Sequence, residues 1–152
     1  NYTGPANLIA ATLMIRLCHH IFSLLSPGQP VERRKLYWTL GFPGEGILDC
    51  VEIVSHAVRE GRCLQKPELH HPEAPMSLGG QFVFDITYRE KTVRVWPSAD
   101  VFDDEFRDQV SRWQEQAPSK ERQKYLHYKQ YKAKQILEAP VESLFMHQWL
   151  KQ

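Results

Sequence analysis

The residues best placed for chemistry lie in a basic, tyrosine-rich stretch between residues 120 and 134. Ammonium and guanidinium groups contact nucleic-acid phosphates, and tyrosine rings stack on bases. A four-residue step puts most of these side chains on one helical stripe. The pattern predicts a nucleic-acid-binding helix carried by Lys120, Arg122, Lys124, Tyr128, Lys129 and Lys132. The alternative is a solvated helix whose tyrosines pack inward and whose lysines offset a neighbouring acidic segment.

The same helix contains a second pattern, Arg122 followed by His127. This Arg-x4-His spacing resembles that of HEPN-type ribonucleases. The resemblance implies an Arg and a His from paired subunits that converge on the scissile phosphate. A metal-independent ribonuclease is therefore one alternative function, although the match covers only two residues.

Other reactive side chains lack the spacing that catalysis or metal binding needs. His70 and His71 are flanked by Glu68 and Glu73, but adjacent loop residues point apart and the helical i,i+4 ligand spacing is missing. Cys63 beside one of these histidines has nothing to orient the base. No phosphate-binding or nucleotide-binding glycine motif is present. We therefore expect no catalytic residue, no metal and no cofactor, which favours a protein that is not an enzyme.

Composition and charge fit an ordinary globular chain of 152 residues, with 42% apolar and 24% charged residues. This length predicts a single domain over 1–152. The formal net charge of +1 is low for a protein that binds nucleic acid over its whole surface. Charge is nevertheless uneven, since residues 100–108 are acidic and residues 120–134 are basic. Local charge of this kind matters for partners more than the sum does.

The three cysteines and the first apolar stretch bear on the cellular compartment. Three is an odd number without a CxxC pair, so we expect reduced thiols and a cytoplasmic protein. Residues 8–25 are apolar enough to suggest a membrane span, but Arg16 near the middle costs about 2.5–3.5 kcal/mol for insertion. We predict a buried helix and no membrane contact. The first residue is Asn1, from which we expect a processed or excised piece of a larger protein.

Periodicity and breakers predict the elements. Helical patterns predict helices over 5–25, 30–40, 45–60, 120–138 and 141–150, with a further helix that begins near Ser98. Residues 61–80 have no period and predict a long loop. Residues 82–96 alternate as a β-hairpin, with Tyr88 expected to face Val93, Ile86 to face Val95 and Thr87 to lie opposite Arg94.

These elements predict a mainly helical α+β domain, with five or six helices and one β-hairpin over 82–96. The order of three helices and a hairpin in 5–96 resembles a winged helix-turn-helix, and 98–152 is then a C-terminal helical extension. The resemblance implies a third helix that enters the DNA major groove, with the hairpin as the wing. That third helix, however, carries four acids against Arg59, so its charge opposes phosphate. A winged-helix-like scaffold for protein contacts is the alternative.

The function favoured by these residues is a non-enzymatic binding domain. It belongs to a larger nucleic-acid-handling protein or complex and contacts phosphates through residues 120–134. The alternative of a different class is a helical adaptor or assembly domain that binds only protein. The pattern leaves DNA, RNA and protein open as partners.

Overall fold

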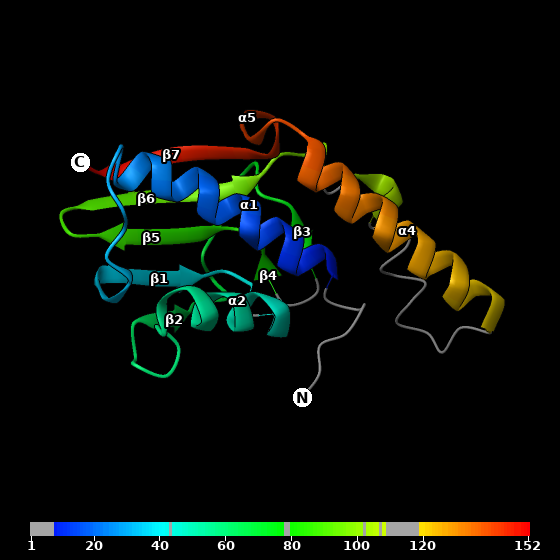
Figure 1. Cartoon of the computed structure of the whole chain (residues 1–152), viewed down its shortest axis with the longest axis horizontal. Helices are drawn as coiled ribbons and strands as arrows, with labels where there is room; N and C mark the ends of the chain where they lie inside the picture. Colours follow the sequence, from blue (N-terminus) through cyan, green and yellow to red (C-terminus); the bar gives the residue numbers. More distant parts are fainter. Residues whose placement is uncertain (1–7, 43, 78–79, 102, 107, 109–118) are drawn as a thin grey trace.

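The computed structural model describes residues 8–42, 44–77, 80–101, 103–106, 108 and 119–152. Its centre is a five-stranded mixed sheet with the strand order β2-β1-β5-β6-β7 (Figure 1). The strands of this sheet are β1 (Leu36–Leu40), β2 (Cys63–Gln65), β5 (Phe84–Tyr88), β6 (Lys91–Pro97) and β7 (Phe145–Lys151). β1 and β2 are parallel, and the other neighbours are antiparallel. A separate pair joins β3 (Met76–Ser77) to β4 (Gly80–Gln81).

Helices cover one face of the sheet. α1 (Leu8–Leu25) runs across the β6 and β7 side of that face, and α2 (Glu45–Ser55) lies near the β1 and β2 side (Figure 1). α4 (Ser119–Glu138) packs against α1, and the single turn of α5 (Val141–Leu144) leads into β7. A short 3-10 turn, η2 (Arg33–Lys35), precedes β1.

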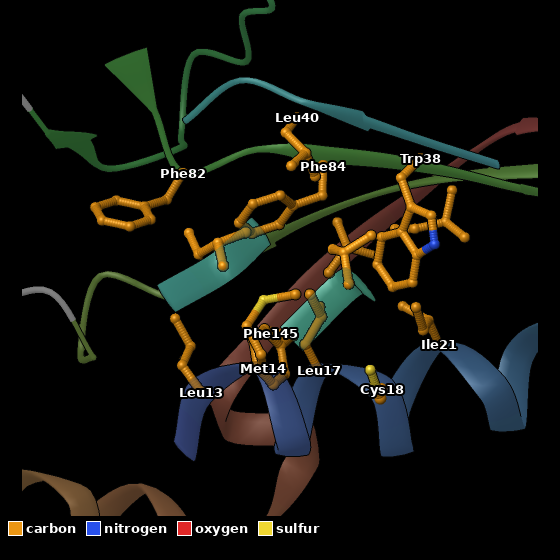
Figure 2. Packing of buried hydrophobic residues seen from close by; sticks show 14 of the residues in the cluster. Leu13, Met14, Leu17, Cys18, Ile21, Trp38, Leu40, Phe82, Phe84 and Phe145 are labelled. Atoms are coloured by element: carbon orange, nitrogen blue, oxygen red, sulfur yellow. The ribbon is translucent and has the colours of Figure 1, made fainter. Parts of the chain in front are cut away.

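The core lies between α1 and the inner face of the sheet. Leu13, Leu17 and Ile21 of α1 point at the strands, and each is at most 1% exposed (Figure 2). They meet a row of paired strand residues in which Trp38 lies opposite Ile86. Full burial of one such side chain contributes about 1.5–3 kcal/mol. This contact fixes α1 to the sheet.

The apolar character of α1 has a structural explanation. Among the described residues, α1 is the one helix long and apolar enough to cross a membrane by length and composition. A core helix passes the same test, and nine residues of α1 are buried within the protein.

The predicted mainly helical fold, with its winged-helix-like order in 5–96, is wrong, because the chain forms a five-stranded sheet. Two predicted helices account for most of the error. Residues 30–40 contain β1, whose Leu36, Trp38 and Leu40 are buried while Tyr37 is exposed, which is a period of two. Residues 141–150 contain only the short α5 and then β7.

Smaller corrections concern the segments between these elements. The predicted loop over 61–80 contains β2 and β3 and the first residue of β4. The helix predicted over 45–60 ends at Ser55, because His56 adopts a left-handed conformation (φ 57°) and caps the helix through its N–H. The helix predicted from Ser98 lies mostly outside the described residues. The helices predicted over 5–25 and 120–138 are present as α1 and α4.

The predicted hairpin is present, but its register differs by two residues. Ile86 lies opposite Val93, and Tyr88 lies opposite Lys91, so the turn consists of Arg89 and Glu90. A shift of two keeps each side chain on its predicted face. Arg89 takes the positive φ (56°) that glycine would normally supply. Its guanidinium bonds to Glu32 at 2.7 Å, which helps to hold this conformation.

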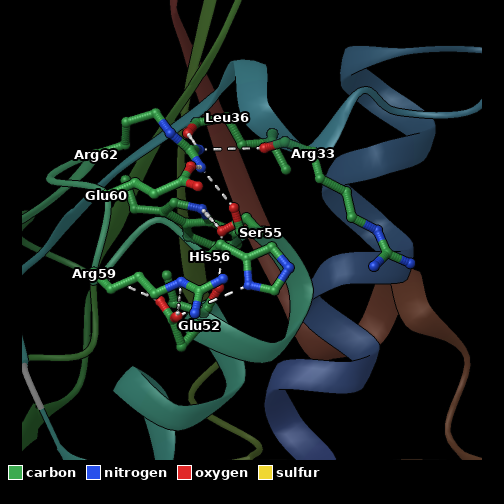
Figure 3. Close-up of polar contacts among 10 residues, drawn as sticks. Arg33, Leu36, Glu52, Ser55, His56, Arg59, Glu60 and Arg62 are labelled. Carbon is green, nitrogen blue, oxygen red and sulfur yellow. Dashed lines mark hydrogen bonds and ion pairs between the residues drawn. The ribbon is translucent and has the colours of Figure 1, made fainter.

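A buried guanidinium joins β1, α2 and the segment that leads to β2. Arg62 is 9% exposed and donates hydrogen bonds to the carbonyls of Leu36 (2.6 Å) and Ser55 (2.7 Å), and more weakly to Arg33 (Figure 3). Its charge is balanced by Glu60. The guanidinium therefore satisfies the last carbonyl of α2, that of Ser55, and fixes the start of β1 at the same time.

We expect Arg62→Ala to destabilise the protein by about 3–5 kcal/mol, since it leaves buried carbonyls without donors and removes a buried charge from its partner. Urea unfolding followed by circular dichroism measures the change. Arg59→Ala is the matched control, because the Arg59 side chain is 69% exposed and its contact with Glu52 is worth at most about 1 kcal/mol. Equal unfolding midpoints for the two variants would contradict this account of Arg62.

Candidate protein-binding edge

The structure divides the six residues predicted to bind nucleic acid. Tyr128, Lys129 and Lys132 are 7%, 3% and 2% exposed, so they belong to the buried side of α4. Lys124 is exposed on the same helix. Lys120 and Arg122 lie in α4, and their side chains are outside the described structure.

The burial of the two lysines follows from the packing of α4. The Lys132 ammonium lies 3.6 Å from a carboxylate oxygen of Asp103, in the acidic segment. The Lys129 ammonium lies 4.5 Å from the centre of the Tyr125 ring, and burial lowers the pKa of Lys129. The Tyr128 hydroxyl is buried without a hydrogen bond within the described residues, and burial raises its pKa. Side chains in these positions cannot reach a phosphate while the helix stays packed.

The other reactive residues from the sequence are also structural in their contacts. The His71 ring stacks on Trp96 at 3.7 Å between centroids, and its Nδ1 accepts a hydrogen bond from the Glu73 N–H. Burial raises the pKa of Cys63 to about 11, which opposes a reactive thiolate. Within the described residues no group of three or more His, Cys, Asp or Glu side chains could hold a metal.

One open groove of about 770 Å³ lies at the far end of α1, beside the turn of the hairpin. Glu32, Tyr88 and Arg89 line it. The Arg89 guanidinium is already engaged, since it bonds to the Glu32 carboxylate and lies 5.4 Å from the centre of the Tyr88 ring. The charges of Glu32 and Arg89 thus help to hold the turn of the hairpin.

Two histidines meet where α1 crosses β7. The rings of His20 and His147 are 5.3 Å apart, and His20 also stacks on Phe145 at 5.8 Å. His20 Nε2 is buried without a hydrogen bond within the described residues. Burial lowers the pKa of His20, His147 lowers it further, and Glu142 opposes the shift. The arrangement therefore favours a neutral His20.

The backbone N–H and C=O groups of alternate β7 residues point to opposite sides of the strand, toward β6 or away from it. The Ser98 N–H donates a hydrogen bond to the Leu144 carbonyl, so these two residues form a hydrogen-bonded pair. The next pair along the ladder, Pro97 opposite Phe145, is therefore one without direct hydrogen bonds. Hydrogen-bonded pairs alternate along an antiparallel ladder. Met146 and Gln148 consequently bond to β6, whereas the N–H and C=O groups of His147 and Trp149 point to the outer side of the sheet. β7 ends the strand order, so no strand within the described residues pairs with these groups.

The two edges of the sheet differ in their protection. β2 is three residues long, and Arg62 and Lys66 flank it. β7 is seven residues long, contains no proline, and has Lys151 as its one charged residue. Its bulge lies beyond Trp149, at the end of the strand. Natural sheets block open edges by shortness, charge, proline or bulges, and most of β7 has none of these devices.

Exposed apolar side chains accompany the β7 edge. Met146 is 46% exposed and Leu150 44% exposed. Alternation places Met146 on the face opposite to His147, away from α1. Ala74 and Leu69 pack with Val83 and with Trp96 of β6, and so cover part of that face. The β7 end of the outer face therefore offers apolar contacts beside unpaired backbone groups.

The sequence interpretation missed this edge because it assigned 141–150 to a helix. A signal was present in the alternation of Phe145, His147 and Trp149 with Met146 and Gln148. The rings lie on the face toward α1, where Phe145 is 3% exposed. No family model matches the chain, and no curated protein is significantly similar to it.

Two charge reversals on α4 separate the buried lysines from the exposed ones. We expect Lys132→Glu to destabilise the protein by about 3–5 kcal/mol, because it places a buried carboxylate beside Asp103. Lys124→Glu should change stability by less than about 0.5 kcal/mol. Urea unfolding of both variants is the measurement, and a Lys132→Glu protein as stable as Lys124→Glu would refute the buried position.

Protonation of His20 should cost stability. Its pKa in the folded protein lies below the ordinary 6.5, so the unfolded chain binds the proton more readily. The stability contribution of neutral His20 is complete above pH 6.5 and is lost as the pH falls through the range down to the folded pKa. The free energy of unfolding that His20 contributes changes by at most about 1.4 kcal/mol per pH unit. Urea unfolding at several pH values should show a shallower decline for His20→Phe than for the wild type, and parallel declines would contradict this role.

Proposed function

We propose that this chain is an assembly domain that binds an extended polypeptide along the free edge of β7. The observation that carries the proposal is the outward direction of the His147 and Trp149 backbone groups on a long strand, most of which lacks a device that blocks an edge. Such groups are matched by the alternating donors and acceptors of another β-strand. Strand addition of this kind is a recurrent mode of peptide recognition.

The surface around this edge supports a protein partner. Met146 and Leu150 add exposed apolar area next to the backbone groups. Backbone hydrogen bonds supply affinity in strand addition, while alternate side chains supply specificity. Of the β7 residues, Lys151 is the one that carries a full charge at neutral pH.

The α4 helix supports nucleic-acid binding less well. Phosphate binding depends on accessible cations, and Lys129 and Lys132 are buried. Lys124 and Lys134 are exposed, and the latter lies 3.8 Å from Glu138. Binding of DNA or RNA through residues 120–134 stays a prediction, which mobility-shift assays with single- and double-stranded DNA and RNA over a salt series would test.

A proline at an outward-facing position tests the proposal. His147→Pro removes an N–H that points away from β6, so it should spare the sheet while it blocks strand addition. A phage-displayed library of random peptides, long enough to pair with all of β7, supplies the probe. We expect peptides selected on the wild type to bind His147→Pro at least about tenfold more weakly, equivalent to about 1.4 kcal/mol.

His147→Ala is the matched control, because it removes the same side chain and keeps the N–H. It should retain peptide binding, and thermal melting should verify that both variants stay folded. Selected peptides that bind His147→Pro as well as His147→Ala would overturn the proposal. So would a selection that yields no binding peptide, or steeply salt-dependent nucleic-acid binding that Lys124→Glu abolishes.

A further inference from the structure

We infer that the strand bound at this edge is β7 of a second copy of this chain, antiparallel and related by a two-fold axis at Gln148. The inference rests on the proposed function and names the partner. A two-fold axis perpendicular to the sheet joins two five-stranded sheets into one continuous sheet, with the helices of both copies on the same side.

The direction of the backbone groups permits this register. With Gln148 opposite Gln148 of the second copy, His147 lies opposite Trp149 of that copy. These are the positions whose N–H and C=O groups point outward, so each such pair exchanges both of its hydrogen bonds. The Gln148 pair then falls at a site without direct backbone bonds, where facing side chains approach most closely.

The side chains of β7 are complementary to themselves in this register. Met146 lies opposite Leu150 of the second copy, and the same contact recurs on the other side of the axis. Both side chains are exposed in the single chain, at 46% and 44%. Apolar cross-strand pairs stabilise a sheet relative to small side chains. Pairing therefore buries the exposed apolar residues of this edge against one another.

Charge does not oppose the pairing. Lys151 is the one fully charged residue of β7, and its two copies lie at opposite ends of the paired strands. The separation is about 20 Å at 3.4 Å per residue, which exceeds the Debye length of about 8 Å in physiological salt. The net charge of +1 also gives little repulsion between whole copies.

α5 limits the alternative registers. A shift by two residues that centres the axis on His147 would place Leu150 and Lys151 of the second copy beside α5 (Val141–Leu144), where the chain is helical and presents no strand edge. The opposite shift, centred on Trp149, leaves Phe145 and Met146 without a partner from the strand. An axis at Gln148 centres the pairing on the regular part of β7 that precedes the bulge, and the pairing ends where α5 begins to replace the strand.

Charged substitutions of Gln148, the residue at the two-fold axis, test the inference on the full chain. Sedimentation velocity should detect a concentration-dependent dimer of the wild type. Gln148→Lys should weaken it about fivefold at low salt, because like charges then face each other, and Gln148→Glu should do the same. A mixture of the two variants should restore dimers. Gln130→Lys carries the same charge at an exposed position on α4 and should leave dimerisation unchanged.

A cysteine at the axis reports the register directly. Cα atoms in a pair without direct hydrogen bonds are about 4.5 Å apart, which a disulfide can span. Mild oxidation should convert Gln148→Cys into a covalent dimer much faster than Gln130→Cys, in the same background of three native cysteines. A monomer at all concentrations, or a dimer indifferent to the Gln148 changes, overturns the inference. If peptides still require the His147 N–H in that case, the proposed function stands without the second copy; if they do not, both fail.

Discussion

The apolar side chains of α1 occupy nearly the whole circumference of the helix, so one packing surface is not enough to cover them. The inner face of the sheet covers Leu13, Leu17 and Ile21. α4 packs against another side of α1, although more than ninety residues separate the two helices along the chain. A helix that is apolar nearly all round requires such a central position. The position of α4 follows from this requirement.

The inner face of α4 is set by its contact with α1 and by the acidic segment near Asp103. Tyr125, Tyr128 and Ile136 turn inward, and Lys132 has to turn with them. Its aliphatic stem packs while its ammonium reaches a carboxylate, which lowers the cost of burying the charge. Lys132, which the sequence places on a basic stripe, thus forms a structural ion pair with Asp103 in the fold.

Elements with strong local periodicity could be predicted from the sequence. α1, α4 and the faces of the hairpin were of this kind. β1 and β7 were missed, because five to seven residues of mixed apolar and polar type also suit a short helix. What decides in favour of a strand is pairing with distant residues, as when Trp38 lies opposite Ile86 and Trp149 opposite Val93. The burial of Lys129 and Lys132 escaped prediction for the same reason, since spacing along a helix does not reveal which neighbours arrive from elsewhere in the chain.

The asymmetry of the sheet edges limits the kind of assembly that strand addition can give. Water satisfies the outward groups of β7 in a single chain, so the open edge costs little stability. Its consequence is association, and a chain with two open edges would propagate into fibres. In the described part of this chain the other edge is the short β2, held between Arg62 and Lys66. Growth through β7 of a second copy uses the same surface on both partners, and a contact of that type closes after two subunits. The difference between the edges thus favours a finite pair over an open array.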